Sequence, residues 1–351
     1  MMPALPLALS ACVLLASWWL TGRVRQYALE RRVLDIPNAR SSHSIATPRG
    51  GGMAIVVTTC LALAAAGSLD LLPWRHVWGM LGGGTLVAII GFADDHRPRA
   101  RRWRLLGHFV AAGVVVACFR GLPPLPAFGT EIDPGWLGYP VAALYVAWLV
   151  NLTNFMDGID GLAAIEVITV ALGGILVYVL AGRETGAWVT PLLLASATFG
   201  FLLWNWAPAK IFMGDAGSGF VGLMLAALSL QAAWAVPTLF WSWLILLGVF
   251  IVDATLTLCR RAIRGERFYE PHRTHAYQHA AQRRAAHKPV TVAVALINLC
   301  WLIPIAVLVA LHQLDGLTGI LVAYTPLTVV ALWLGAGTPE TTPFESATRH
   351  I

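Results

Sequence analysis

The stretch VAALYVAWLVNLTNFMDGIDGLAAIEVITVALGGILVYVL, residues 141–180, decides the fold of this chain. Two apolar runs of roughly twenty residues, the length that a membrane-spanning helix needs, enclose one short polar segment. The apolar residues follow one another without the polar alternation of a membrane β-barrel strand. The stretch therefore predicts two membrane helices joined by a polar turn.

The rest of the 351-residue chain repeats this pattern. Hydrophobic residues make up 58% of it and charged residues 12%, with mean hydropathy +0.69, whereas a soluble domain carries about 25% charged residues. We expect an all-α integral membrane protein, a single polytopic domain of about eleven helices around a cytoplasmic cleft. The expected helices span residues 3–21, 51–69, 77–93, 105–120, 138–154, 162–181, 187–206, 218–236, 238–258, 290–311 and 317–334. The loops expected to form the cleft are 22–50, 94–104, 155–161, 207–217 and 259–289.

Basic residues are distributed unevenly between the two sides of the predicted bundle. The loops after helices 1, 3, 5, 7 and 9 hold 6, 5, 0, 1 and 8 of the chain's 24 Lys and Arg residues. Because positive residues mark cytoplasmic loops, we expect the N-terminus outside and the C-terminus inside. Arginines follow the first apolar run instead of preceding it, which favours an uncleaved helix over a signal peptide. The acidic motifs lie in these same loops, so we expect them to meet at one membrane face.

The net charge of +6 follows from this positive-inside pattern. Anionic lipid headgroups at the cytoplasmic surface would supply the opposite charge. The chain offers no soluble domain with a basic patch and base-stacking aromatic residues, which argues against nucleic acid binding. Membrane lipid is therefore an expected partner, and nucleic acid is not.

Asp94 and Asp95 close the third apolar run and are followed by five arginines between positions 97 and 104. Adjacent carboxylates repel each other unless they share a cation or a proton. Mg²⁺ suits such oxygen ligands and is commonly held by one or two carboxylates together with substrate phosphates. A solvated helix end paired with the arginines is the alternative interpretation.

The polar segment of the opening stretch is the strongest motif, with Asn151, Asn154, Asp157 and Asp160 each three residues apart. At this spacing the four side chains would lie along one side of a helix. The glycine after each aspartate permits a tight turn or a close approach of a ligand to the backbone. Solvation explains one or two such residues, but not four in register between two membrane helices.

Asp215 belongs to the small-residue segment FMGDAGSG, residues 212–219, which leads into the eighth apolar run. Backbone N–H groups at a helix start favour anions, and a carboxylate there could fix a metal beside them. Lys210 precedes the segment, but the Gly-Lys-Ser/Thr ending of a P-loop is missing. An ordinary capped loop is the alternative interpretation.

The last large loop contains His272, Arg273, His275 and His279. The three histidines would share one face of a helix. Three histidines could bind zinc, but the arginine among them favours contact with phosphate and nucleotide. A solvated loop is the alternative.

Two further groups of residues are candidates for a supporting or binding role. In the first loop, Arg40, His43 and Arg49 either bind phosphate or only follow the positive-inside rule. Asp253 and Glu166 lie inside predicted spans, where ionisable residues are functional candidates. Both are within roughly 10 Å of the cytoplasmic end at 1.5 Å rise per residue, so we expect them to support a site at that end.

Taken in order, these segments resemble the polyprenyl-phosphate N-acetylhexosamine-1-phosphate transferases of glycosyltransferase family 4. The resemblance covers most of the chain, from Asp35 to His279. The matching pieces are Asp35-x-Pro-x-x-Arg40-x-x-His43, Pro48-Arg49-Gly-Gly, Gly91-x-x-Asp94-Asp95, Asn151-x-x-Asn154-x-x-Asp157-Gly-x-Asp160-Gly-Leu, Phe212-Met-Gly-Asp215-x-Gly-Ser218, and Asp253 with the histidine loop.

The resemblance implies transfer of an N-acetylhexosamine-1-phosphate from a UDP-sugar to undecaprenyl phosphate, with release of UMP, at the inner membrane of a bacterium. It implies Mg²⁺, or Mn²⁺ in its place, held chiefly by Asp215. Residue chemistry and resemblance together give three groups of candidates. The catalytic group is Asp94, Asp95, Asp157 and Asp160, with Asp95 also a metal ligand; the substrate-binding group is Arg40, His43, Arg49, Asn151, Asn154, Lys210, His272, Arg273, His275 and His279; the supporting group is Asp253 and Glu166.

One departure from the family pattern concerns the histidine loop. Many members carry Asp-Arg-x-His-x-His-His, whereas this chain has HRTHAYQH at residues 272–279. That variant is similar to the branch that primes O-antigen synthesis in bacteria. The expected partners are therefore undecaprenyl phosphate, a UDP-N-acetylhexosamine, membrane lipid and, as an option, a second copy of the chain.

The expected reaction is attack of the lipid phosphate oxygen on the β-phosphorus of the UDP-sugar, with Asp94 assisting deprotonation or positioning. A two-step route through an aspartyl-phosphate is the alternative. Among other classes, an ion-coupled transporter or lipid flippase usually places its polar site near the bilayer midplane, often within repeats. A CDP-alcohol phosphotransferase would continue differently after Asp157-Gly158, where the Asp-Gly-x-x-Ala-Arg opening is missing.

Overall fold

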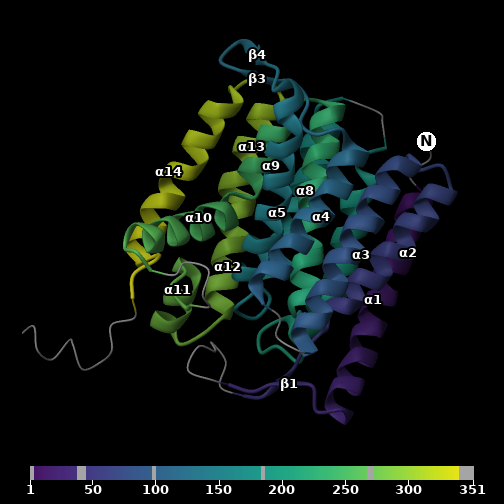
Figure 1. Cartoon of the computed structure of the whole chain (residues 1–351), viewed down its shortest axis with the longest axis vertical. Coiled ribbons are helices and arrows are strands. Elements are labelled where there is room, and N and C mark those ends of the chain that lie inside the picture. The colour runs from purple at the N-terminus through teal and green to yellow at the C-terminus, as the bar shows by residue number, and fades with distance from the viewer. Residues whose placement is uncertain (1–3, 38–44, 97–99, 183–185, 267–271, 340–351) are drawn as a thin grey trace, which may run out of the picture.

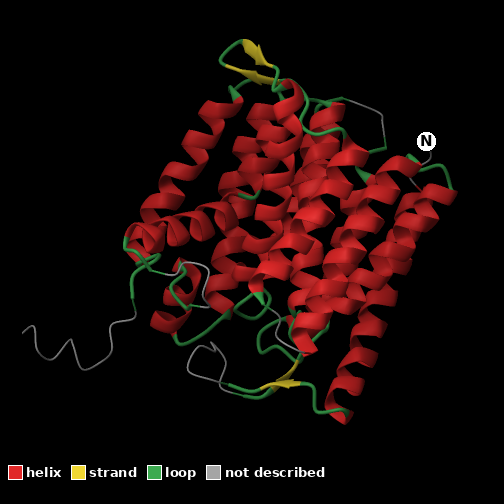
Figure 2. Cartoon of the chain, viewed as in Figure 1, coloured by secondary structure: helices red, strands yellow, loops and turns green. Residues whose placement is uncertain are grey.

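The structure, a computed structural model, is a bundle of helices with two short hairpins at its ends (Figure 1; Figure 2, helices in red). It describes residues 4–37, 45–96, 100–182, 186–266 and 272–339. Arg40 and His43, which the sequence analysis places in the first loop, lie outside these described residues.

The first two thirds of the chain form eight long helices in sequence. They are α1 (Ala4–Glu30), α2 (Gly52–Ser68), α3 (Trp74–His96), α4 (Arg101–Phe119), α5 (Gly138–Met156), α6 (Leu162–Leu180), α7 (Val189–Asn205) and α8 (Asp215–Ala235). Strands β1 (Leu34–Asp35) and β2 (Thr47–Pro48) pair antiparallel, as do β3 (Leu125–Ala127) and β4 (Thr130–Ile132). A short 3-10 turn, Gly135–Leu137, leads into α5.

The last third is less regular. It contains α9 (Leu239–Leu246), α10 (Gly248–Ile263), α11 (Ala276–Arg284), α12 (Lys288–Ile297), a π-helical segment (Asn298–Leu302), α13 (Ile303–Ala310) and α14 (Gly316–Leu334). Thus α12, the π-helical segment and α13 together occupy the run expected at 290–311. Among the described residues, eight helices or continuous helical runs are long and apolar enough to cross a membrane, α9 with α10 would form a ninth span, and α2 and α7 are shorter apolar helices.

The structure departs from the expected helices at three places. Helix α1 continues to Glu30, so part of the expected first loop is helical. Helix α3 continues to His96 and α4 begins at Arg101, so most of the described part of the loop expected at 94–104 is helical as well. The single helix expected at 238–258 is wrong, because α9 and α10 are bent by 68° at their junction. Helix α10 carries Asp253, Arg260 and Arg261, and the bend turns this charged helix across the bundle instead of through it (Figure 1).

Helix α8 lies at the centre of the bundle and is buried along its whole apolar window. Small residues let its neighbours approach closely, as membrane helix packing requires. A Cβ atom on Gly222 would lie 2.6 Å from the Leu149 carbonyl oxygen of α5, and one on Gly91 of α3 would lie 2.5 Å from the Asp215 carbonyl oxygen. The start of α8 is therefore surrounded by the ends of neighbouring helices.

Helices α3, α5 and α7 finish at the same end of the bundle, where α8 begins and β1 lies (Figure 1). We call this the site end. The β3–β4 hairpin lies at the opposite end. The three acidic motifs lie at the ends of α3 and α5 and at the start of α8, so the alternation of helices brings them to one end, as the helix count predicts.

Candidate active site

Charged side chains from the first loop and from the end of α3 meet Asp215 at the start of α8. The Asp95 carboxylate accepts hydrogen bonds from the backbone N–H groups of Asp215 (3.1 Å) and Ala216 (3.4 Å). Arg49 Nη2 lies 2.5 Å from Asp95 Oδ1 and 3.0 Å from Asp215 Oδ1. Although burial opposes its charge, the Asp215 and Asp95 carboxylates raise the pKa of Arg49 above its ordinary value. Arg49 is therefore a fixed cation between two carboxylates.

The loops that carry these side chains are fastened together through their backbones. The N–H groups of Gly51 and Gly52 donate to the carbonyls of Phe212 and Met213, each at 2.9 Å. A Cβ atom added to Gly52 would lie 2.5 Å from the Cα of Gly217. Glycine at these positions therefore lets the first loop reach the start of α8 and sets Arg49 against Asp215.

A second arginine completes the cluster. Arg104 Nη1, from the first turn of α4, lies 2.7 Å from Asp94 Oδ2 and 3.7 Å from Asp215 Oδ2. Asp94 thus faces Arg104, while Asp95 faces Arg49. The expectation that Asp94, Asp95, Asp215 and Arg49 belong to one site agrees with this arrangement, but sequence reasoning missed Arg104 as a site residue.

Asp157 joins the cluster from the end of α5. Burial raises the pKa of Asp157 well above its ordinary value, and the negative charges of Asp215 and Asp95 raise it further, while Arg49 partly offsets them. Like charges raise the pKa of a carboxyl group in this way when the carboxylates lie near one another. The cluster is therefore an acidic site in which like charges repel and a cation would be stabilised.

The expectation of one continuous helical face over 151, 154, 157 and 160 is wrong. Helix α5 ends at Met156, and Asp157 is its C-cap residue with φ −87° and ψ 49°. Gly161 has φ +73°, a conformation that glycine adopts without steric cost. The glycines thus end one helix and turn the chain into the next, so the two aspartates point to different places.

The four polar side chains of this motif have different partners. Asn154 Nδ2 donates to Ser218 Oγ in the first turn of α8 at 3.0 Å, which ties α5 to the Asp215 segment. Asn151 Nδ2 donates to the Ala147 carbonyl of its own helix at 2.7 Å. Asn154 therefore helps to position the site, whereas this hydrogen bond of Asn151 lies within α5.

Asp160 links the loop before α6 to two other parts of the chain. Its Oδ2 accepts from the backbone N–H of Ala209 at 3.1 Å, and its Oδ1 lies 3.1 Å from His287 Nδ1. The Thr291 hydroxyl of α12 donates to the Asp160 carbonyl at 2.8 Å. These contacts favour a positioning role for Asp160, and His287 is a partner that the sequence analysis did not identify.

Asp253 anchors the start of α11. Its carboxylate accepts from the backbone N–H groups of Ala276 and Tyr277, each at 2.9 Å, and contacts His275 Nδ1 at 3.3 Å and the Thr257 hydroxyl at 3.2 Å. A carboxylate at the first turn of a helix satisfies N–H groups that have no partner within the helix. Asp253 therefore holds the histidine loop from α10.

The expectation that the three histidines share one helical face is also wrong. His272 precedes α11, His275 is its N-cap residue, and only His279 lies within the helix. The His275 ring is buried and lies 6.3 Å from the Phe155 ring, centroid to centroid. The Asp253 carboxylate accepts hydrogen bonds from the N–H groups of Ala276 and Tyr277. The helix therefore begins at Ala276, after His272 and His275.

The histidine loop contacts the end of α5 directly. The Tyr277 hydroxyl donates to the Phe155 carbonyl at 2.9 Å, two residues before Asp157. Burial, together with the charges of His275 and Arg261, lowers the pKa of His272 to about 3. The half-buried His272 ring is therefore neutral at physiological pH, and its Nδ1 lies 3.0 Å from the Thr274 hydroxyl.

The remaining candidates lie further from the acidic cluster or make local contacts. Lys210 Nζ lies 5.7 Å from the centroid of the Trp204 ring, and its carbonyl accepts from Arg25 Nε at 3.3 Å. Arg273 is half-buried in the segment before α11, and His279 lies within that helix. No contact among the described residues joins Lys210 to the carboxylates of the cluster.

Glu166 belongs to a separate buried group. Its Oε2 accepts from Asn298 Nδ2 at 2.7 Å, and Asn298 also donates to the Thr169 hydroxyl at 2.8 Å. Asn298 opens the π-helical segment, a rare kind of helical irregularity that is often found at functional sites. Glu166 thus joins α6 to the segment between α12 and α13, which is a supporting role within the bundle.

An apolar cavity of about 310 Å³ opens beside the acidic cluster, between α1, α2 and α3. Arg49 and Asp95 line one part of it, and apolar side chains line the rest. Its other lining residues are Leu20, Val24, Tyr27, Ala28, Val33, Gly50, Met53, Val57 and Phe92. Tyr27, Val57 and Phe92 are exposed on the outside of the bundle, so the cavity lies near the surface that faces lipid.

The donor chemistry of the cluster fits a hard divalent cation. The described residues contain no group of three or more His, Cys, Asp and Glu side chains placed around one point. A metal would therefore be held by one or two carboxylates, Asp215 and Asp95 being the expected ones, and by substrate phosphates, which is the usual Mg²⁺ pattern. The Asp95 and Asp215 carboxylates, which the Arg49 cation already brings together, are the observation that makes a cation favourable here.

Comparison with known proteins identifies the class. The family model for glycosyl transferase family 4 matches residues 77–233. The chain is 28% identical over 293 residues to a probable undecaprenyl-phosphate N-acetylglucosaminyl 1-phosphate transferase of Bacillus subtilis, covering 82% of this chain and 81% of that protein. It is 29% identical over 309 residues to a decaprenyl-phosphate N-acetylglucosaminephosphotransferase of Mycobacterium tuberculosis, covering 80% and 76%.

The name of a third relative specifies a different transferred group. The chain is 31% identical over 235 residues to a phospho-N-acetylmuramoyl-pentapeptide-transferase of Heliobacterium modesticaldum, covering 63% of this chain and 72% of that protein. The chain therefore belongs to glycosyl transferase family 4. It is a transferase and a multi-pass membrane protein.

Proposed function

We propose that this protein transfers an N-acetylhexosamine-1-phosphate from a UDP-sugar to undecaprenyl phosphate in the inner membrane of a bacterium. The observation that carries the proposal is the position of the acidic cluster. Asp95 and Arg49 belong to the cluster and also line an apolar cavity beside it. A site for a lipid phosphate needs this combination of an apolar channel and a charged end.

The acceptor lipid would enter from the side of α1, α2 and α3. Its first isoprenoid units would lie against Leu20, Val24 and Met53, and its phosphate would meet Arg49. A guanidinium group is well suited to a phosphate because it donates two parallel hydrogen bonds. Arg49 would exchange its present carboxylate contacts for the incoming phosphate, leaving Asp95 and Asp215 available to a cation.

The donor would lie between the cluster and the histidine loop. Asp253 holds the start of α11, and Tyr277 fastens that helix beside Asp157. A neutral His272 could donate or accept hydrogen bonds to the nucleotide without adding charge. The acidic cluster lies at one end of the bundle, which favours a transferase over a transporter with a midplane site.

In the proposed reaction, a lipid phosphate oxygen forms a bond to the β-phosphorus of the UDP-sugar. The bond from that phosphorus to the bridging oxygen breaks, and UMP leaves with the electron pair. Mg²⁺, or Mn²⁺, bound by Asp215 and Asp95 would polarise the diphosphate and stabilise the leaving group. Arg104 holds Asp94 in place, and Asp94 would position the attacking phosphate or accept its proton.

The product would be the first lipid-linked sugar of a cell-surface polysaccharide of the O-antigen type, the branch that the histidine loop resembles.

The test of the proposed function is UMP release by purified protein given undecaprenyl phosphate, Mg²⁺ and a panel of UDP-N-acetylhexosamines. We expect release that requires both lipid and metal, and a loss of at least about 100-fold in Asp215→Asn.

Asp70→Asn is the matched control, because Asp70 is exposed at the opposite end of the bundle and Asn tolerates its positive φ of 55°. It should retain full activity. Metal-independent release, or undiminished release in Asp215→Asn, would contradict the proposal.

A further inference from the structure

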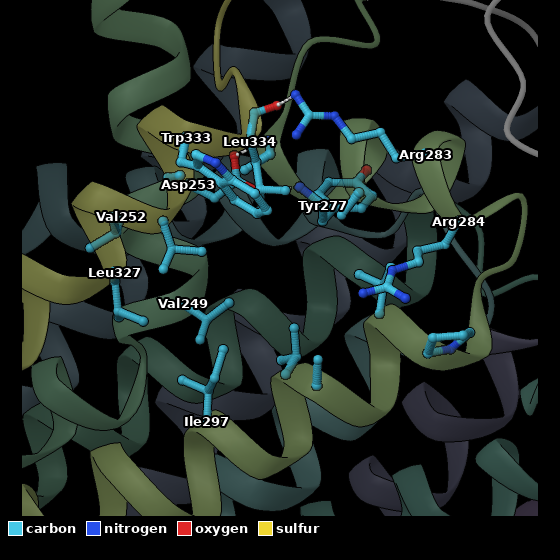
Figure 3. A pocket seen from close by; sticks show the side chains of 18 residues that line it. Val249, Val252, Asp253, Tyr277, Arg283, Arg284, Ile297, Leu327, Trp333 and Leu334 are labelled. Atoms are coloured by element: carbon cyan, nitrogen blue, oxygen red, sulfur yellow. Dashed lines mark hydrogen bonds between the residues drawn. The ribbon is translucent and has the colours of Figure 1, made fainter.

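A second cavity, of about 390 Å³, lies between α10, α11, α12 and α14 (Figure 3). Its size is within the range of small-molecule sites, about 300–1,000 Å³. Most of its lining is aliphatic, and the charged side chains lie on α10 and α11. The apolar lining residues include Val249, Val252, Val290, Ala293, Val294, Ile297, Leu327, Val330 and Leu334. We call this cavity the α14 groove.

Two arginines of α11 line the groove. Arg283 Nη2 donates to the Leu334 carbonyl at 3.1 Å, and its guanidinium lies 5.7 Å from the centroid of the Trp333 ring. Arg284 extends from α11 toward the centre of the lining side chains (Figure 3). Within the described part of the chain, no carboxylate forms an ion pair with Arg284. The groove thus offers a positive charge at the edge of an apolar surface.

Asp253 is the one carboxylate in the lining, and its charge is already engaged. It accepts hydrogen bonds from two backbone N–H groups of α11 and contacts the His275 ring and the Thr257 hydroxyl. Donors arranged around a carboxylate offset its negative charge. An anionic group near Arg284 would therefore meet more positive than negative potential.

The groove is distinct from the site proposed for the reaction. None of Arg49, Asp95, Asp157 and Asp215 is among its lining residues. A lipid phosphate beside Arg284 would therefore not be in position to attack a diphosphate at the acidic cluster. Trp333 is 74% exposed near the end of α14, and exposed tryptophan is typical of the level of lipid headgroups.

We propose that the α14 groove binds an anionic phospholipid that is not a substrate, with its phosphate at Arg284 and one acyl chain along α12 and α14. The bound lipid would brace α11, whose Tyr277 also lines the groove and fastens the helix to Phe155 beside Asp157. The effect on turnover rests on the proposed function, whereas lipid binding itself does not.

Native mass spectrometry of the delipidated protein with phosphatidylglycerol or phosphatidylcholine tests the binding. We expect one phosphatidylglycerol to bind more tightly than phosphatidylcholine, and Arg284→Gln to weaken phosphatidylglycerol about fivefold while leaving phosphatidylcholine unchanged. Ala293→Trp, which places an indole on the exposed Ala293 of the groove wall, should remove both lipids. Arg23→Gln, an exposed arginine of α1 outside both cavities, is the matched control.

Three outcomes would overturn the proposal. Equal affinity for the two phospholipids would show that Arg284 does not select an anionic lipid. Full binding in Ala293→Trp, with unchanged thermal unfolding, would place the lipid elsewhere. Displacement of phosphatidylglycerol by undecaprenyl phosphate, one molecule for one, would make the groove an acceptor site instead.

UMP release in nanodiscs then separates this proposal from the proposed function. We expect phosphatidylglycerol to lower the KM for the UDP-sugar in the wild type and not in Arg284→Gln. If phosphatidylglycerol lowered the KM for the UDP-sugar equally in both proteins, lipid in the α14 groove would not influence donor binding. No UMP release in any lipid would count against the proposed function, while the binding data would still decide the lipid site.

Discussion

At the scale of single residues, Arg49 decides whether the acidic cluster can form. Its guanidinium contacts Asp95 and Asp215, whose carboxylates would otherwise repel each other at the start of α8. We predict that Arg49→Gln lowers kcat/KM for UMP release by about 100-fold, the usual cost of removing one preorganised charge-stabilising donor. Arg49→Lys should restore only part of this, because an ammonium group cannot bridge two carboxylates as a planar guanidinium does.

Steady-state UMP release by the two variants measures the effect, with Arg23→Gln as the control arginine. Wild-type kcat/KM in Arg49→Lys would show that a positive charge alone suffices and that the bridging geometry of the guanidinium does not matter. Sequence reasoning named Arg49 as a candidate but could not choose between phosphate contact and the positive-inside rule. The choice depends on its partners Asp95 and Asp215, which lie 46 and 166 positions further along the chain.

His272 gives a prediction about pH. Burial and the charges of His275 and Arg261 lower its pKa to about 3 in the folded protein, whereas an unfolded histidine titrates near about 6.5. Between these values the unfolded state binds a proton that the folded state does not, so folding stability falls as pH is lowered. We predict that thermal unfolding of the wild type shifts to lower temperature between pH 7 and pH 5 by more than that of His272→Gln. Parallel shifts in the two proteins would contradict a buried, neutral His272.

At the scale of elements, the packing of α11 on the end of α5 depends on one glycine. A Cβ atom on Gly158 would collide with the Tyr277 hydroxyl, which donates to the Phe155 carbonyl. We predict that Gly158→Ala displaces α11, lowers the free energy of unfolding by about 1–3 kcal/mol, and raises the KM for the UDP-sugar about tenfold. Thermal unfolding and donor titration measure the two effects.

Gly113→Ala is the matched control for this substitution. Gly113 lies in α4, and a Cβ atom there would meet no other atom within 4 Å, so alanine should leave activity unchanged and favour the helix. Wild-type KM in Gly158→Ala would mean that the histidine loop does not depend on its contact with α5. The two variants exchange the same residue types and differ only in what surrounds the added carbon.

The elements also show where sequence patterns were sufficient and where they were not. Long apolar runs fixed the approximate helices from α2 to α8, since a membrane span has a length set by the bilayer. The bend between α9 and α10 was not predictable from hydropathy, because the charged residues of α10 lie near the end of an otherwise apolar run. The three-residue spacing of the Asn and Asp motif was misleading, because the glycines stop α5 before the pattern ends.

Short sequence motifs identified some residues of the candidate site, but not those that act through distant partners. Asp94, Asp95, Asp157 and Asp215 were recognisable from short motifs at helix ends. His287 and Tyr277 were not, because each contributes through a partner far along the chain, Asp160 and Phe155 respectively. Arg104 was not distinguished from the arginines around it, because its link to Asp215 joins two distant parts of the chain. Charge patterns indicate which end of the bundle carries chemistry, but packing decides which charges pair.

At the scale of the whole molecule, the alternation of helices makes a prediction about sidedness. The bundle places the acidic cluster and β1 at the site end and the β3–β4 hairpin at the opposite end (Figure 1). Loops at the site end carry most of the Lys and Arg residues, and such loops remain in the cytoplasm. Because UDP-sugars are cytoplasmic substrates in the proposed reaction, the site end must face the cytoplasm for the protein to act.

Cysteine labelling in intact cells tests this orientation. In a variant without the five native cysteines, Thr130→Cys lies in β4 and Arg31→Cys lies at the site end, and both positions are exposed. We predict that a membrane-impermeant maleimide labels Thr130→Cys in intact spheroplasts, but labels Arg31→Cys only after the membrane is permeabilised. The reverse pattern would place the acidic cluster outside, where no UDP-sugar reaches it, and labelling of both sites in intact cells would mean that the chain does not insert with a single orientation.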